Sequence, residues 1–315
     1  MSFFSRLFSA LLTLFIVSVV IFAIFQVIPG DAVLNRLGID ADPVLVELLR
    51  EQLQLDLPPV QRYVHWIGRA LQGNLGTSLR FDSSVVELIN SRLPNTLLLS
   101  LMAFGEVLLL GLPLGIWLAN HPGVGGLIGG ALVQVLLATP VFALSIALML
   151  IFCIWLNWLP ISVFNGWEVG IGQLMRSLIL PSFAISLPSV AVVVRYLQSA
   201  LNEQRNQDYV RTARNKGLNE NQILRHHLLR NALIPVLTIL GIILINTLGG
   251  SIVVETAFSI PGIGQLLNTA IRARDLPLVQ GISLYITSIV VLGYLILDVL
   301  YAWVDPRIAG GGADR

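Results

Sequence analysis

Long stretches of almost uninterrupted apolar residues dominate the hydropathy pattern of this 315-residue chain. They cover approximately 7–28, 96–119, 127–155, 178–197, 233–253 and 281–304. Each has about the 20 residues that a helix needs to cross the hydrocarbon of a bilayer. We therefore predict six transmembrane helices, with Pro140, Pro181 and Pro188 interrupting the third and fourth.

The first apolar stretch has to be distinguished from a secretory signal peptide. It is longer than the core of such a signal, which has about 7–15 residues. No small-x-small cleavage pattern follows it, and the stretch ends in Pro29-Gly30-Asp31. We expect a retained first membrane helix over residues 1–29.

Composition agrees with a membrane protein. Hydrophobic residues make up 55% of the chain and charged residues only 12%, compared with about 25% charged residues in a soluble domain. These few polar groups cannot cover the surface of the protein. Much of that surface must therefore face membrane lipid. The net charge of +1, without a basic stripe, gives no reason to expect a nucleic-acid partner. Cys153 is the single cysteine, which rules out an internal disulfide.

Basic residues in the short loops indicate the orientation. Between the fourth and fifth stretches lie Arg205, Arg211, Arg214, Lys216, Arg225 and Arg230. The short loops on the other side carry only Arg176, Arg272 and Arg274. The pattern predicts an all-α integral membrane protein with both termini cytoplasmic. Its expected parts are an external helical loop over 30–95, a five-helix core over 96–308 with a cytoplasmic loop over 198–232, and a flexible tail over 309–315.

Templates for catalysis and metal binding are missing. The sequence has no G-x-x-x-x-G-K-[ST] loop to hold ATP phosphates, no H-E-x-x-H and no paired C-x-x-C. His226 and His227 are adjacent, so on a helix they point about 100° apart and make a poor metal pair. We expect no enzyme activity, and no cofactor or metal bound by this chain.

Glu106 falls near the middle of the second predicted span. Burying its charge unpaired would cost about 2.5 kcal/mol or more. It is therefore expected to line a translocation pathway, to face a partner subunit or to be protonated. The alternative is a structural role beside Gly105, where small residues admit water. Arg195 and Asp298 could pair across the fourth and sixth spans or snorkel to the interface.

The loop over 198–232 is charged and yet helical in its pattern. A helix over 208–216 would end at Gly217 as a C-cap glycine. Asn219 and Gln222 then resemble the capping box of a second, amphipathic helix that runs to about Leu229. Such a helix could insert an apolar and basic face into a groove of a soluble partner. It could equally lie on lipid headgroups.

Residues 209–218 and 225–235 resemble the EAA loop of ATP-binding-cassette (ABC) importer permeases, in the form of the dipeptide/oligopeptide/nickel branch. The general EAA pattern has Glu where this chain has Arg211 and Pro where it has Arg230; both departures are typical of that branch. The resemblance covers nearly the whole chain. Further matching runs are 29–31, 55–66, 73–78, 92–97, 255–264, 274–281 and 298–307.

This resemblance implies a type I ABC importer permease fold with a cytoplasmic coupling helix, in the bacterial inner (plasma) membrane. The implied partners are a second, similar permease in a heterodimer, two cytoplasmic ATPase subunits that bind ATP and Mg, and an external (periplasmic) substrate-binding protein. The implied ATPase-coupling residues are Ala213, Gly217, Leu218, Ile223, Leu224, His227, Arg230 and Asn231. Tyr63 and Trp66 are expected either to contact the binding protein or to pack in the core.

The implied cargo is a di- or oligopeptide or a similar small solute, with nickel complexes, opines and sugars as alternatives. Two other functions remain open. A secondary transporter would need no ATPase, but no inverted repeat or cluster of ion ligands is evident. A membrane scaffold would use the same loop for binding alone, and the intramembrane Glu106 argues mildly against it.

Overall fold

The computed structural model describes residues 3–27, 42–52, 56–121, 123–159 and 170–304. Within these ranges the regular elements are helices, and no β-strand is present. The matching run at 29–31, the end of the run at 298–307 and the predicted tail at 309–315 lie outside them. The all-α prediction is confirmed for the described part of the chain.

Five helical stretches are long and apolar enough to cross a membrane, and a bent pair of helices makes a sixth if it counts as one span. The five cover Phe4–Ile24, Val85–Asn120, Ile171–Arg205, Glu220–Ala257 and Leu276–Leu300. Each contains or overlaps one of the predicted stretches. The structure thus supports a membrane protein with five or six spans.

The third predicted stretch, 127–155, is not one straight helix. Helix α7 (Val124–Ala138) and the following α8 (Val141–Leu148) with the π-helix η2 (Met149–Trp155) meet at an angle of 110°. At the break, Thr139 and Pro140 are extended, with ψ of 121° and 143°. Proline disfavours the helical conformation in the residue before it, which explains the break.

The prolines of the fourth predicted stretch do not interrupt its helix. Helix α9 (Ile171–Arg205) runs through Pro181 and Pro188 without ending. Pro181 and many other residues of α9 are buried, and α6, α8 and α12 pack against this helix. Such surroundings make proline tolerable inside a membrane helix.

The helices form two compact units, which we call the terminal unit (Met1–Thr96 and Pro261–Arg315) and the central unit (Leu97–Ile260). The boundary falls inside helix α5. The terminal unit contains α1 (Phe3–Val27), α3 (Pro43–Gln52), α4 (Pro59–Leu71), the start of α5 (Val85–Glu106), α14 (Ile263–Arg272) and α15 (Leu276–Val304).

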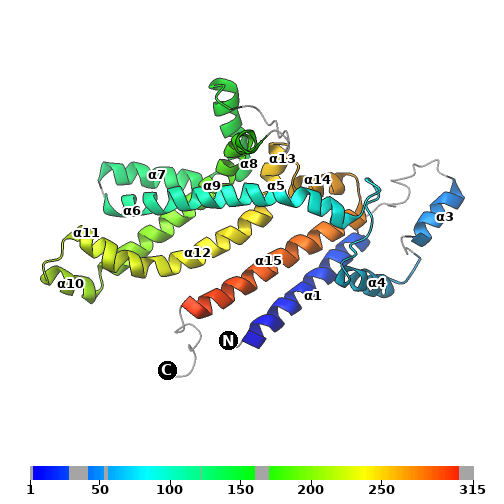
Figure 1. The fold of residues 1–315 in the computed structure, drawn as a ribbon, viewed down its shortest axis with the longest axis horizontal. Coiled ribbons are helices and arrows are strands. Elements are labelled where there is room, and N and C mark those ends of the chain that lie inside the picture. Colours follow the sequence, from blue (N-terminus) through cyan, green and yellow to red (C-terminus); the bar gives the residue numbers. More distant parts are fainter. Residues whose placement is uncertain (1–2, 28–41, 53–55, 122, 160–169, 305–315) are drawn as a thin grey trace. The chain divides into compact units, whose positions relative to one another are not determined.

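The central unit contains the rest of the helices around α9. They are the end of α5, the π-helix η1 (Val107–Gly111), α6 (Leu112–Asn120), α7, α8, η2, α9, α10 (Asp208–Asn215), α11 (Glu220–Ile223), the π-helix η4 (Leu224–Leu228), α12 (Leu229–Gly250) and α13 (Ile252–Ala257). Helix α9 lies against α6, α7, α8 and α12 (Figure 1). Gly111 and Gly115 permit the close approach of α9, because a Cβ at either would come within 3.1 Å and 3.0 Å of Val193 and Leu197.

In the terminal unit α1 lies along α15 (Figure 1), and α4 packs against α1. Trp66 of α4 is buried together with Ile21 and Phe22 of α1. The hydroxyls of Tyr63 and Ser18 are hydrogen-bonded at 2.8 Å. Of the two expectations for Tyr63 and Trp66, core packing is therefore the one that the structure supports.

A second cluster of the terminal unit is organised by Asp275, the residue before α15. Its Oδ1 accepts a hydrogen bond from the backbone N–H of Leu278 at 3.3 Å, as an N-cap does. Its Oδ2 accepts from the hydroxyl of Ser78 at 2.5 Å and the N–H of Arg80 at 3.1 Å. The segment before α5 is thereby tied to the start of α15.

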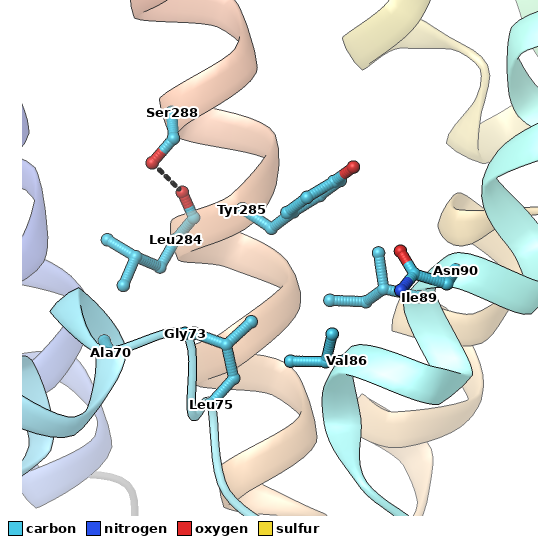
Figure 2. Close-up of a pocket in the computed structure, with 9 residues that line it drawn as sticks. All are labelled: Ala70, Gly73, Leu75, Val86, Ile89, Asn90, Leu284, Tyr285 and Ser288. Atoms are coloured by element: carbon cyan, nitrogen blue, oxygen red, sulfur yellow. Dashed lines mark hydrogen bonds between the residues drawn. The ribbon is translucent and has the colours of Figure 1, made fainter.

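The terminal unit also contains a cavity of about 280 Å³. Figure 2 shows Leu284 and Tyr285 of α15 on one side and Val86 and Ile89 of α5 on the other. Its other lining residues are Ala70, Gly73, Leu75, Asn90 and Ser288, so the lining carries no charged side chain. Such a lining offers no anchor for a charged cargo.

Candidate functional site

The loop between α9 and α12 has a fixed backbone that begins with the end of α10. Gly217 has φ of +82°, a conformation that favours glycine. Its N–H donates to the carbonyl of Arg214 at 2.9 Å, and the N–H of Leu218 donates to the carbonyl of Ala213 at 3.3 Å. These two bonds make a complete Schellman cap, so the predicted role of Gly217 as a C-cap glycine is confirmed.

The next turn is closed by Asn219. Its Oδ1 accepts from the N–H of Gln222 at 2.9 Å, and Oε1 of Gln222 accepts from the N–H of Asn219 at 3.0 Å. The predicted capping box is therefore present. The capping box directly follows the glycine cap. The end of α10 and the start of α11 are therefore both fixed by hydrogen bonds within a few residues.

The second helix of the loop differs from the prediction. It is not a separate amphipathic helix that ends near Leu229, because α11 continues through η4 into α12. The sequence from Leu218 to Ile234 contains neither glycine nor proline, so nothing in it ends a helix. Leu228 and Ala232 are buried along the same face, which stabilises the continuous form.

The apolar side of the loop is turned towards its own chain. Ala213 and Ile223 are buried, and Leu218 and Leu224 are partly buried against the same core cluster. That cluster includes Leu197, Leu201, Val210 and Leu228. These residues therefore hold the loop in place. The sequence predicted an exposed face that is both apolar and basic, and the apolar part of that prediction is wrong.

What the loop presents outwards is polar and basic. Between Leu197 and Leu233, a stretch that the structure describes completely, no large apolar side chain is exposed. The exposed residues include Arg211, Arg214, Lys216, Arg225, Arg230 and Asn231. An interfacial helix needs an apolar face for the lipid, so this surface suits a soluble partner better than headgroups.

One ion pair crosses the glycine turn. Nε and Nη2 of Arg214 donate to Oε1 and Oε2 of Glu220 at 2.8 Å and 3.2 Å. The hydrogen bonds from Arg214 hold the pKa of Glu220 below its ordinary value, and those to Glu220 raise the pKa of Arg214. His227 is half-buried, with its ring centroid 6.4 Å from that of Tyr209.

The start of the loop is fixed by Arg205, the last residue of α9. Its guanidinium donates to the carbonyl of Ala119 at 2.8 Å and to the side-chain oxygen of Asn120. Both acceptors belong to the last turn of α6, where helix carbonyls lack partners of their own. The loop (Figure 1, α10 and α11) is thus anchored to two helices of the central unit.

Glu106 is the last residue of α5 and directly precedes η1. It belongs to a different part of the chain from the α9–α12 loop. Its Oε1 accepts from the hydroxyl of Ser182 at 2.5 Å, and its Oε2 accepts from that of Ser186 at 2.6 Å. Both serines are fully buried on α9, and Glu106 remains partly exposed. The small neighbour Gly105 offers no hydrogen bond to the carboxylate, whose protein partners are these two hydroxyls. Arg195 and Asp298 fall in different units, so their pairing stays a prediction.

Comparison with known proteins identifies the family. Residues 111–310 match the family described as binding-protein-dependent transport system inner membrane component. Residues 1–100 match the N-terminal part of such membrane components. The chain belongs to this family. The expected location in the bacterial inner membrane is confirmed with it, and so is the resemblance to permeases of ABC importers.

The relatives of this inner membrane component are nearly equal to it in length. The oligopeptide transport system permease protein AppB of Bacillus subtilis (strain 168) is 37% identical over 301 residues, which is 93% of this chain and 94% of AppB. The "Probable peptide ABC transporter permease protein y4tP" of Sinorhizobium fredii (strain NBRC 101917 / NGR234) is 33% identical over 306 residues, 96% and 97% of the two chains. These relatives are transport permeases and not enzymes.

Several polar residues of this inner membrane component were missed by reasoning from the sequence. Ser182 and Ser186 were not singled out, although their spacing of four places them on one face of a helix. Asp275 was seen only as part of a matching run, and its spacing of three from Leu278 is that of an N-cap. Glu255 was seen in the same way; it is fully buried and accepts from the hydroxyl of Ser251 at 2.8 Å.

Proposed function

We propose that this chain is one permease subunit of an ABC importer for di- or oligopeptides. The observation that carries the proposal is the match over nearly the whole chain to a relative named as an oligopeptide transport permease. The bent pair α7 and α8–η2 would form one of six spans, and both termini would be cytoplasmic. The abundance of arginine in the α9–α12 loop supports this orientation.

The proposed complex has four further subunits: a second, similar permease, two ATPase subunits that bind ATP and Mg, and an external substrate-binding protein. The α9–α12 loop would dock on an ATPase through its exposed basic residues. Ala213, Leu218, Ile223 and Leu224 would position that surface from inside, while Arg230 and Asn231 would lie on it. His227, half-buried, would take part at its edge. Glu106 would line the pathway.

Purification in mild detergent from the native host, followed by mass spectrometry, tests the assembly. We expect ATPase subunits and a second permease to remain bound. Uptake of radiolabelled peptides, nickel and sugars by proteoliposomes that contain the purified complex then tests the cargo. Uptake of peptide without ATP by this chain alone would contradict the proposal and favour a secondary transporter. ATP-dependent uptake of nickel or a sugar, with no peptide, would keep the importer and overturn the cargo.

Gly217 gives a sharp test of coupling. A Cβ at this position would meet nothing within 4 Å, so only its backbone conformation opposes a side chain. We expect Gly217→Val to strain the cap by about 1–2 kcal/mol and to lower ATP-driven uptake more than membrane insertion. Gly217→Asn is the matched control, because asparagine tolerates this conformation. Equal uptake by the valine variant and the wild type would remove Gly217 from the coupling site.

A further inference from the structure

The carboxylate of Glu106 is bound from one side only. Ser182 and Ser186 lie one turn apart on α9, and each donates to a different oxygen of Glu106. An ionised carboxylate has about four acceptor positions, so two bonds leave acceptor capacity on both oxygens. The serines are fully buried and Glu106 is partly exposed, so that remaining capacity is on its open side.

The positive charge that would balance Glu106 is missing from the described part of the chain. No lysine, arginine or histidine there forms an ion pair with it. The two arginines of α9 nearest to the serines in sequence, Arg176 and Arg195, are six residues before Ser182 and nine after Ser186, roughly 9 and 13 Å along the helix. Both are exposed, and Arg176 donates to the carbonyl of Trp158. An ionised group inside a membrane span without a counter-charge is energetically costly.

The backbone next to Glu106 is also unusual. The helix changes to π-helical hydrogen bonding at Val107, and such local π-turns are frequent at functional sites. Leu101 of α5 and Leu109 of η1 are exposed, whereas Glu106 between them is bonded to the serines of α9. The π-turn therefore begins directly after the carboxylate that α9 holds.

We propose that Glu106, held by Ser182 and Ser186, is a transit site for a cationic amine of the cargo. An ammonium group supplies the missing positive charge, and its three N–H donors match the unused acceptors of the carboxylate. The α-ammonium of a peptide and the side-chain ammonium of lysine share this chemistry. The inference rests on the import of peptides proposed above and names a contact that the cargo makes on its way.

A single carboxylate suits a site that the cargo occupies briefly better than a site that holds it tightly. A charge-assisted hydrogen bond is about twice as strong as one between neutral groups, so it compensates for part of the hydration that the amine loses. A site in a pathway has to be weak enough to release its ligand. Two serines and one partly exposed carboxylate meet that condition, whereas a closed cage of several acids would not.

The first test measures uptake. Proteoliposomes with the full complex and excess binding protein are given trialanine and ATP. We expect Glu106→Gln to lower the uptake rate about tenfold, the change that corresponds to about 1.4 kcal/mol, with subunit composition unchanged. Glu106→Asp is the matched control that keeps the charge, and it is expected to stay within about threefold of the wild type. Wild-type uptake by Glu106→Gln would overturn the proposal.

The second test needs no transport. The purified complex is treated with a water-soluble carbodiimide and glycine methyl ester, which couples an amine to an accessible carboxylate, and the fraction of Glu106 that stays unmodified is measured by mass spectrometry. Trialanine amide and N-acetyl-alanyl-lysine amide, which have no carboxylate to consume the carbodiimide, are expected to slow the modification, and N-acetyl-trialanine amide is not. Protection by only one of the first two identifies which amine is bound. No labelling at all, or equal protection by the three peptides, would overturn the site.

The two tests separate the two proposals. A wild-type complex that imports no peptide contradicts the proposed function, and the labelling still decides whether Glu106 binds an amine. A complex that imports peptide equally well with glutamate or glutamine keeps the importer and removes the transit site.

Discussion

Asp275 in the terminal unit and Glu106 in the central unit are both bound by serine hydroxyls, but they are held differently. Asp275 is only 1% exposed and accepts hydrogen bonds from two backbone N–H groups and from Ser78. Glu106 is partly exposed, and its protein donors are the two rotatable hydroxyls of Ser182 and Ser186. Fixed backbone donors indicate a structural acid, whereas movable donors on one side leave an acid open to a ligand.

The largest expected effect is at Asp275. Asp275→Ala removes the N-cap of α15 and leaves the N–H of Arg80 and the hydroxyl of Ser78 without this acceptor. We expect a loss of about 2–4 kcal/mol in the stability of the terminal unit. The fraction of protein that stays monodisperse in size-exclusion chromatography after heating measures it. A stability equal to that of the wild type would mean that Asp275 is no more structural than Glu106.

A second, smaller effect is expected where α15 passes the start of α5. A Cβ on Gly281 would lie 2.6 Å from Cγ1 of Val85 and 3.3 Å from Cβ of Leu75. We expect Gly281→Ala to cost about 1–3 kcal/mol through overpacking, measured by the same heating assay. Gly68→Ala in α4 is the control, since its Cβ would meet nothing within 4 Å. Equal behaviour of the two variants would show that the terminal unit is not tightly packed around Asp275.

The serines of α9 test the other side of the comparison. We expect the double variant Ser182→Ala with Ser186→Ala to change the stability of the central unit by less than about 1 kcal/mol, because water can replace the hydroxyls at a partly exposed carboxylate. A thiol-reactive dye can follow this unfolding, since the single cysteine, Cys153, is buried in the same unit. A loss as large as that of Asp275→Ala would make Glu106 a structural acid as well.

The smallest effect belongs to an exposed carboxylate, Glu220. Its pKa is lowered by the hydrogen bonds from Arg214, so its contribution to stability is present at neutral pH. That contribution disappears as the pH falls from the ordinary carboxyl range through the lowered pKa of the folded state. We expect Glu220→Gln to melt slightly below the wild type at pH 7 and together with it in acid. High salt reduces the difference, because the pair is exposed. A difference that grows in acid would contradict this origin.

The sequence predicted local features of the loop well because their causes are local. The glycine cap at Gly217 depends on a backbone conformation that few other residues adopt. The box of Asn219 and Gln222 depends on a spacing of three residues. The lengths of the apolar stretches likewise predicted the spans, since bilayer thickness sets them.

What the sequence did not predict depends on neighbours that are remote in the chain. Pro140 lies at a break between two helices, whereas Pro181, Pro188 and Pro235 lie inside continuous helices, so a proline alone does not predict a break. The apolar residues of the loop were expected to face a partner, yet Ile223 is fully buried in a core cluster of the central unit. Ser182 and Ser186 gain their importance from Glu106, about 80 residues earlier on another helix.

The uninterrupted path from α11 through η4 into α12 has a mechanical consequence. A joint between a docking loop and a span would absorb displacement, whereas a continuous helix transmits it as a rod does. In the proposed complex, movement of Arg225 by an ATPase subunit would be carried along α12 into the membrane. Arg225 lies in η4, whose five residues have the wider i→i+5 bonding. The displacement that reaches the span would therefore depend on how rigidly the backbone of η4 is held.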